Sequence, residues 1–173
     1  MKIYQTSDIR NIALVGGAKS GKTTMAEAMA FNGGVINRRG SVEDKNTISD
    51  YRDIEIDRRN SVNTSLLYSE FGGKKINVID CPGFFDFAGD VNAALRATEC
   101  GIIFLTAKDG ISVGAERSWK LLKEANMPVM FYVSKCDEEH GDFAGVLSAL
   151  QAKYGSIVCA VTAPTSDGKG VID

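Results

Sequence analysis

The sequence predicts an α/β fold of three layers, with helices on both faces of a mostly parallel sheet that has one antiparallel hairpin strand. Three observations lead to this prediction. Apolar runs alternate with amphipathic helical stretches after residue 90, as in parallel sheets with right-handed crossovers. A glycine turn at residues 71–74 joins two strand-like segments. A glycine-rich loop stands between the first apolar run and the first helical stretch.

Composition limits the class of protein. The chain has 173 residues, enough for one domain with a sizeable core. Its formal net charge of -2 argues against a broad basic surface, so we expect no independent nucleic-acid binding. Four singly spaced cysteines and one histidine argue against a structural zinc site and favour reduced thiols. Neither a signal peptide nor a bilayer-spanning apolar run is found, so we predict a cytoplasmic protein with no membrane partner.

The first predicted elements surround the glycine-rich loop. Residues 9–15 have the character of a buried strand. A helix is predicted over residues 21–31, and Asn-Gly-Gly at residues 32–34 ends it. Its core-facing residues are expected to be Met25, Ala26, Met29 and Ala30.

The connection over residues 38–60 is long for a compact domain, rich in charge and without a sustained apolar period. It has two interpretations. It is either a solvated charged insertion or a segment that becomes ordered around a γ-phosphate and magnesium. The sequence alone leaves both open.

The rest of the chain is predicted as a hairpin followed by alternating helices and strands. The hairpin pairs residues 61–70, with Val62, Thr64, Leu66 and Tyr68 on one side, with residues 75–79. Helices are predicted over residues 91–99, 114–126 and 143–154, and strands over residues 101–106 and 129–133. Residues 157–161 are a candidate for one more strand.

The glycine-rich loop has the spacing G-x-x-x-x-G-K-T, which predicts a P-loop NTPase fold. Its glycines let consecutive backbone N–H groups turn inward around phosphates, and the following helix adds its positive dipole end. Lys22 is expected to reach the β- and γ-phosphates, and the Thr23 hydroxyl to ligate magnesium. The predicted nucleotide contacts in this loop are Gly16, Gly17, Ala18, Lys19, Ser20, Gly21, Lys22, Thr23 and Thr24.

A second motif, D-x-x-G, follows the returning strand of the hairpin. Asp80 can hold magnesium, and the Gly83 amide can sense the γ-phosphate. Lys22 and Gly83 are therefore the candidate catalytic residues. The alternative is a plain turn built on Pro82.

A third motif, Ser134-Lys135-Cys136-Asp137, indicates which base is bound. The Asp137 carboxylate can accept from both guanine N1–H and the guanine N2 amine, whereas adenine presents no such donor pair. A site built on that pattern rejects the wrong base, because its acceptor would stay unpaired. The Lys135 stem can lie along the base plane. Guanine is therefore favoured over adenine.

Together, G-x-x-x-x-G-K-T, D-x-P-G-x-x-D-F at residues 80–87 and S-K-C-D resemble the GTP-binding domain of translational GTPases, elongation factor G and its paralogues above all. The resemblance implies GTP/GDP and Mg²⁺ as ligands and the ribosome as partner of the full-length protein. It also implies that residues 38–60 are the first switch and residues 83–91 the second. By alignment, Ser61 falls where a threonine binds magnesium, and Thr64 is a nearby rival. The predicted metal ligands are thus Thr23, Ser61 and Asp80.

Three residues depart from the family pattern. Phe84 replaces the histidine that positions the hydrolytic water, so slow intrinsic hydrolysis is expected. Ser134 replaces an asparagine and is a shorter tether to the phosphate loop, which predicts modestly lower nucleotide affinity. Lys19 replaces an aspartate, and its ammonium either substitutes for a monovalent cation or is a solvent-exposed loop lysine.

The family's last guanine-binding element, S-A-[LK], does not occur here, and we interpret Thr162-Ala163-Pro164 as the start of an insertion. Residues 1–173 are therefore expected to be one GTP-binding domain that ends before that motif and the downstream domains. Three functions are compared: a GTPase switch in a ribosome-associated cycle, a guanine-nucleotide module with little hydrolysis, and a P-loop kinase or ATPase. The last leaves Asp137 unexplained.

Overall fold

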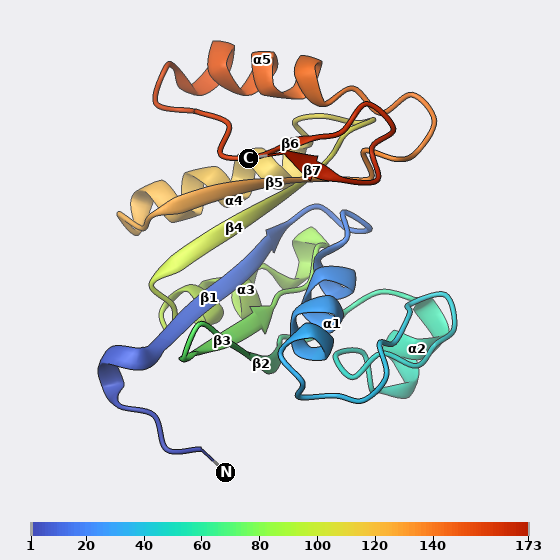
Figure 1. The fold of residues 1–173 in the computed structure, drawn as a ribbon, viewed down its shortest axis with the longest axis vertical. Coiled ribbons are helices and arrows are strands. Elements are labelled where there is room, and N and C mark those ends of the chain that lie inside the picture. Colours follow the sequence, from blue (N-terminus) through green and yellow to red (C-terminus); the bar gives the residue numbers. More distant parts are fainter. Residues whose placement is uncertain (1, 173) are drawn as a thin grey trace.

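The computed structural model describes residues 2–172 (Figure 1). Two short 3-10 helices are η1 (Thr6–Asp8) and η2 (Phe85–Phe87). The α-helices are α1 (Lys22–Asn32), α2 (Asp53–Arg58), α3 (Ala88–Leu95), α4 (Val113–Glu124) and α5 (Phe143–Tyr154). The strands are β1 (Ile9–Gly16), β2 (Ser65–Phe71), β3 (Lys74–Asp80), β4 (Cys100–Thr106), β5 (Val129–Ser134), β6 (Ala163–Pro164) and β7 (Val171–Ile172).

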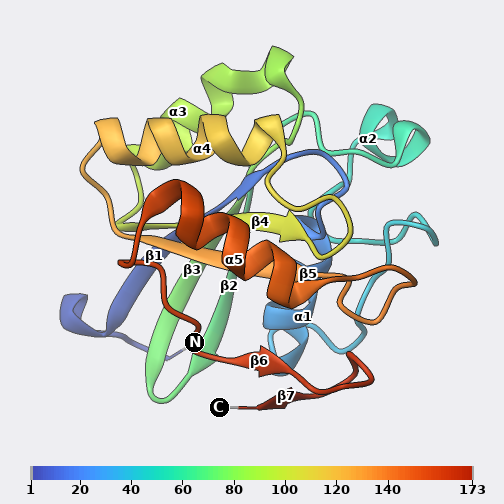
Figure 2. The same cartoon turned by 90° about the horizontal axis from the view of Figure 1, so that it is seen from above.

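The main sheet has the strand order β2-β3-β1-β4-β5. Strand β1 pairs in parallel with β3 and β4, β4 pairs in parallel with β5, and only β2 is antiparallel to its neighbour. This arrangement confirms the predicted fold class. Strands β6 and β7 form a separate two-stranded sheet outside the main one (Figure 2).

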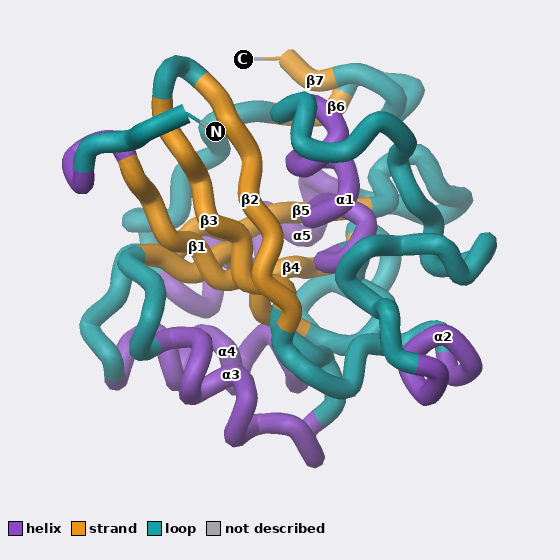
Figure 3. Tube along the Cα trace, turned by 90° about the horizontal axis from the view of Figure 1, so that it is seen from below, coloured by secondary structure: helices purple, strands orange, loops and turns teal. Residues whose placement is uncertain are grey.

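The central strands are buried on both faces, so their side chains alternate between two cores. On β1, Ala13 and Val15 join the larger core beneath α3, α4 and α5, while Leu14 joins the smaller core beneath α1. On β4, Leu105 joins the larger core and Phe104 joins the smaller core. Figure 3 shows α1 on one side of the sheet and α3 and α4 on the other, which makes the three layers.

The hairpin forms, with β2 beginning at Ser65 rather than at residue 61. Leu67 is only 7 % exposed and Leu66 is 72 % exposed, so the odd positions of β2 face the core. Strand β2 lies at the sheet edge, where α1 covers one face only, and the alternation of Leu66 and Tyr68 lies on the uncovered face. The predicted core-facing side of α1 is correct, since Ala26 and Ala30 are fully buried.

Two further elements differ from the sequence prediction. Helix α3 begins at Ala88 and ends at Leu95, earlier than the predicted residues 91–99. Residues 157–161 form no strand. Ile157 and Val161 are 72 % and 77 % exposed, so their apolar pattern does not correspond to pairing at the sheet edge.

The segment over residues 38–60 is ordered and packs beside α1, with α2 inside it (Figure 1). It contributes buried polar residues, among them Thr47, Ser49, Asp50 and Glu55. The segment is therefore not solvated throughout, although most of its charged side chains are exposed. Helix α2 was not predicted, because its six residues are too few to show a helical period.

None of the helices within residues 2–172 has the length and apolarity that a membrane crossing needs.

Candidate functional site

The carboxyl ends of the parallel strands open onto one cleft of about 350 Å³. Ligands of open α/β sheets bind at this edge. The cleft is lined by phosphate-loop residues 18–24, by Asp50 and Ser61 of the long connection, by Gly83 and Phe84, and by Lys135. Three segments far apart in the sequence, each carrying a predicted motif, therefore meet at one place.

Lys22 lies folded against its own loop. Its Nζ donates to the Gly17 carbonyl at 2.6 Å and contacts the Gly16 carbonyl at 3.4 Å, and the side chain is buried. Burial lowers the pKa of the Lys22 ammonium, while the charge of Asp80 opposes this shift. The lysine thus lies at the floor of the phosphate loop, close to the carboxylate predicted to face magnesium.

Two glycines outside the loop press directly on its backbone. A methyl group added at Gly83 would lie 2.5 Å from the Ala18 nitrogen, and one added at Gly114 would lie 2.7 Å from the Gly17 Cα atom. Backbone can approach this closely only because the approaching residue, Gly83 or Gly114, carries no Cβ. The D-x-x-G segment and the amino end of α4 therefore fix the shape of the phosphate loop from two sides. The role of Gly114 was not found from the sequence.

The predicted metal ligands lie together. The Thr23 hydroxyl donates to Asp80 Oδ2 at 2.7 Å, and Thr23 Oγ1 is 3.2 Å from Ser61 Oγ. Burial raises the pKa of Asp80 to about 6, against the hydrogen bond from Thr23 and the charge of Lys22, which lower it. The second carboxylate oxygen of Asp80 has no hydrogen-bond partner within residues 2–172. Thr64 does not line the cleft.

Asp50 joins this group and was missed by sequence reasoning. It is 6 % exposed, and its Oδ1 atom is unpartnered among the residues that the structure describes. Burial raises the pKa of Asp50, the hydrogen bond with Ser61 lowers it, and the charges of Glu55 and Glu27 raise it further. In the sequence, Asp50 is one acid among many in a charged connection, so no signal separated it from its neighbours.

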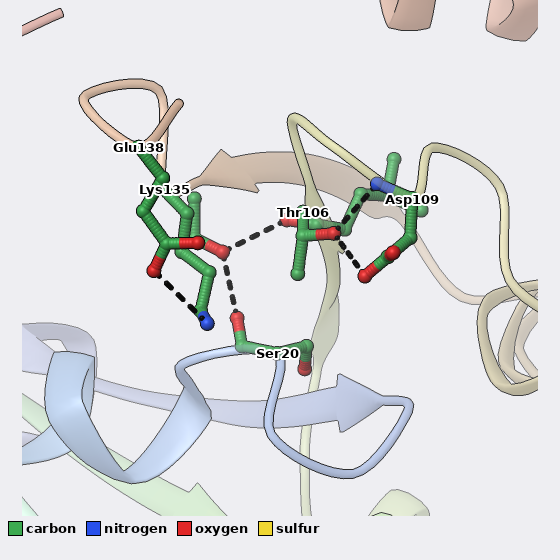
Figure 4. A network of polar contacts seen from close by, with 7 residues as sticks. Ser20, Thr106, Asp109, Lys135 and Glu138 are labelled. Carbon is green, nitrogen blue, oxygen red and sulfur yellow. Dashed lines mark hydrogen bonds and ion pairs between the residues drawn. The ribbon is translucent and has the colours of Figure 1, made fainter. Parts of the chain in front are cut away.

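The base-recognition segment is tied to the phosphate loop. The Ser134 hydroxyl lies 2.8 Å from the Ser20 carbonyl and 3.0 Å from the Leu105 carbonyl. A hydroxyl has one proton for two acceptors, whereas the amide of an asparagine would have two. The predicted tether is present. Nearby, the Lys135 ammonium lies 3.1 Å from Glu138 (Figure 4).

Asp137 is exposed and lines a second, larger cavity of about 760 Å³ between β5, α5 and the C-terminal segment. Lys135 lines both this cavity and the phosphate cleft, so the two are adjacent. The β6–β7 turn closes on this motif, since a methyl group at Gly168 would lie 2.3 Å from the Cys136 carbonyl oxygen. The phosphate-loop cleft and the cavity lined by Asp137 thus adjoin at Lys135.

Phe84 lies at the mouth of the phosphate cleft, about half exposed. A phenyl ring has no donor or acceptor with which to orient water. The neighbouring Phe85 ring lies under the Arg117 guanidinium at 4.4 Å from its centroid. Lys19 also lines the cleft, with a backbone φ of 58°.

Comparison with known proteins decides the family. Residues 7–167 match the family described as the elongation factor Tu GTP binding domain. The chain belongs to this family. Its architecture agrees: a crystal structure of a protein from Thermus thermophilus, 35% identical, covers 96% of the chain and 26% of its own length with a TM-score of 0.91.

Individual relatives indicate which type of elongation factor the chain resembles. The elongation factor G-like protein of Mycobacterium tuberculosis is 32% identical over 92% of this chain and 22% of its own length. Elongation factor G 2 of Borreliella burgdorferi is 32% identical over 95% of the chain and 25% of its own length. The chain is therefore the GTP-binding domain of a translational GTPase of the elongation factor G type. It spans about a quarter of the length of these relatives, and a P-loop kinase or ATPase is not supported.

The contact between Gly114 and the phosphate loop leads to a prediction. Gly114→Ala should weaken GDP binding by about tenfold or more, because the added methyl group must displace the Gly17 backbone in a tightly packed place. Titration with a fluorescent GDP analogue measures this change.

Gly89→Ala in α3 is the matched control, because a methyl group there meets nothing within 4 Å. It should leave GDP affinity unchanged. Equal GDP affinity of the two variants would show that α4 does not shape the phosphate loop.

Proposed function

We propose that the domain is a GTP/GDP-binding switch that hydrolyses GTP slowly in a ribosome-associated cycle of the full-length, cytoplasmic protein. The observation that carries this proposal is the convergence of the phosphate loop, Ser61 and Asp80 on one cleft that continues through Lys135 to Asp137. A guanine nucleotide has phosphates at one end and a base at the other, as this continuous site requires.

At the phosphate end, the loop amides and Lys22 bind the phosphate chain. Lys22 exchanges its contacts with the Gly16 and Gly17 carbonyls for the β- and γ-phosphates, so the ammonium keeps its hydrogen bonds. The Gly83 amide is carried by a segment seated on Ala18. A γ-phosphate that enters or leaves this place therefore moves the second switch.

The residues present fit a magnesium ion. Thr23, Ser61 and Asp80 supply the oxygen donors that this cation prefers, and the unpartnered oxygen of the buried Asp80 carboxylate is available to a metal-bound water. Asp50 adds a second such oxygen. Magnesium, when bound, would neutralise charge on the β- and γ-phosphates. The contact with Thr23 supports Ser61 over Thr64 as the ligand from the first switch.

At the base end, Asp137 accepts from guanine N1–H and N2, and the Lys135 stem covers one face of the base. Ser134 holds this segment to Ser20, so the base and phosphate sites keep a fixed separation. Binding of this kind discriminates strongly, because ATP would leave the Asp137 carboxylate unpaired.

Hydrolysis is expected to be slow because Phe84 stands where a water-orienting group is needed. The phosphate-binding machinery can still hold GTP, so binding and hydrolysis are separable in this chain. A second candidate function follows from the same residue: a guanine-nucleotide module that switches by exchange with little hydrolysis. The ribosome is the partner proposed for the full-length protein, on the strength of its elongation factor G relatives.

Base recognition is tested by calorimetric titration of the chain with GTP, GDP and ATP in magnesium buffer. We expect tight binding of GTP and GDP and no measurable binding of ATP. Asp137→Asn should weaken GTP binding by at least about 100-fold, because one acceptor oxygen becomes an N–H₂ donor that faces the base.

Glu139→Gln is the control for the loss of one negative charge, since Glu139 is a neighbouring exposed acid. Similar GTP affinities for the two variants, or ATP affinity equal to GTP affinity, would contradict guanine recognition by Asp137.

The role of Phe84 is tested in the full-length protein by single-turnover GTP hydrolysis with ribosomes. Phe84→His should raise the hydrolysis rate by about 100-fold, as expected when a group that can orient water and share its proton is supplied. Phe85→His places the same imidazole one residue away and should change the rate little. An unmodified protein as fast as the Phe84→His variant would refute the proposed slow hydrolysis.

A further inference from the structure

Two glutamates are buried without a cationic partner. Glu27 on α1 and Glu55 on α2 are 0 % and 1 % exposed. Neither forms an ion pair with a lysine or arginine in the part of the chain that the structure describes. Burying an unpaired carboxylate is costly unless N–H groups surround it. The backbone contacts of these two side chains therefore account for their position.

Glu27 binds the first half of the 38–60 segment. Its Oε2 accepts from the Gly40 amide at 2.9 Å, and its Oε1 accepts from the Ile48 amide. Glu27 follows Thr23 by one helical turn, so both side chains lie on the same face of α1. The helix that carries the magnesium-binding hydroxyl thus also holds the chain that passes over it.

Glu55 binds the residues that follow Ser61. Its Oε1 accepts from the amides of Val62 and Asn63, both at 3.0 Å, and its Oε2 is 3.4 Å from the Arg52 amide. With the next two amides fixed, Ser61 Oγ is held 3.2 Å from Thr23 Oγ1. Release of Glu55 would free the chain immediately after the predicted metal ligand.

We propose that Glu27 and Glu55 are positioning residues that hold the first switch closed over the phosphate cleft, and that Glu55 places the Ser61 hydroxyl at the metal position. The inference rests on the proposed function, because Ser61 is a metal ligand only there. Asp50 and Asp80 bring two more buried carboxylates into the same region, with Lys22 as the cation that faces them. Hydrogen bonds to backbone amides hold the segment, and repulsion among these acids opposes them.

Glu27 and Glu55 differ in which carboxylate oxygens accept the backbone amides. This difference allows a role in positioning to be distinguished from an effect of negative charge alone. The two amides on Glu27 occupy different oxygens, so a glutamine there must turn its N–H₂ group toward one of them. Both close amides on Glu55 share one oxygen, so a glutamine at 55 can keep both with its single carbonyl and gives up only the long 3.4 Å contact with the Arg52 amide. The same substitution is therefore disruptive at 27 and tolerated at 55.

The test is limited trypsin digestion of the chain bound to a non-hydrolysable GTP analogue and magnesium. The first switch offers trypsin cleavage sites at Arg38, Arg39, Lys45, Arg52, Arg58 and Arg59. Glu27→Gln and Glu55→Ala should be cut in this segment at least about tenfold faster than the unmodified chain, because each loses hydrogen bonds to a charged acceptor. Glu55→Gln should stay within about threefold of it, and so should the control Asp44→Asn at an exposed acid.

A second measurement tests the same role in variants whose digestion is affected by poor folding. Stopped-flow dissociation of the fluorescent GTP analogue is followed at high magnesium and in excess chelator. In Glu55→Ala, magnesium should slow release much less than in the unmodified chain, whereas Glu55→Gln should restore the effect. Ser61→Ala should lose the magnesium effect but keep its protection from trypsin.

The outcomes distinguish the two proposals. If the unmodified chain binds no guanine nucleotide, the proposed function fails. If it binds and Glu27→Gln and Glu55→Ala remain protected, or Glu55→Gln is cut as fast as Glu55→Ala, the positioning role fails. Thermal unfolding of each nucleotide-free variant is measured alongside. Variants that open the first switch are expected to unfold at the same temperature as the unmodified chain.

Discussion

The hydrogen bond from Thr23 to the buried Asp80 carboxylate is the constraint on which the site depends. It joins the first turn of α1 to the end of β3, and so fixes the phosphate loop relative to the start of the second switch. Ser61 reaches the same hydroxyl from the first switch. The phosphate loop and the two proposed switches therefore meet at a single side chain.

Several polar and charged side chains of the domain are buried, and those that hold the 38–60 segment explain how a charged connection becomes ordered. The first switch has few apolar residues to bury, so its order comes from acids that accept from backbone amides. Such hydrogen bonds are directional, and water can replace them once the segment moves away from α1. An element held in this way can be stable in one state and mobile in another, as a switch requires.

The sequence was sufficient for features that local pattern determines. The apolar run of β4, the glycine spacing of the phosphate loop and the turn of the hairpin each depend on residues close together in the chain. Glu27 and Glu55 were not found, because they accept from amides of irregular loops that no sequence pattern places. Asp50 was not found because it is one acid among many in the charged connection. The close approach of Gly114 to Gly17 was hidden for the same reason. The covered face of β2 could not be predicted, because alternation alone does not say which face is covered.

The central claim is that the first switch, in the closed position that it has in this structure, supplies Ser61 to a magnesium ion shared with Thr23 and Asp80. The most direct measurement is a crystal structure of this chain with a non-hydrolysable GTP analogue and magnesium. The account predicts the hydroxyl oxygens of Thr23 and Ser61 at about 2.0–2.1 Å from the metal, with Asp80 reaching it through water. A metal bound by Thr64 in place of Ser61, or with residues 38–60 displaced from α1, would contradict it.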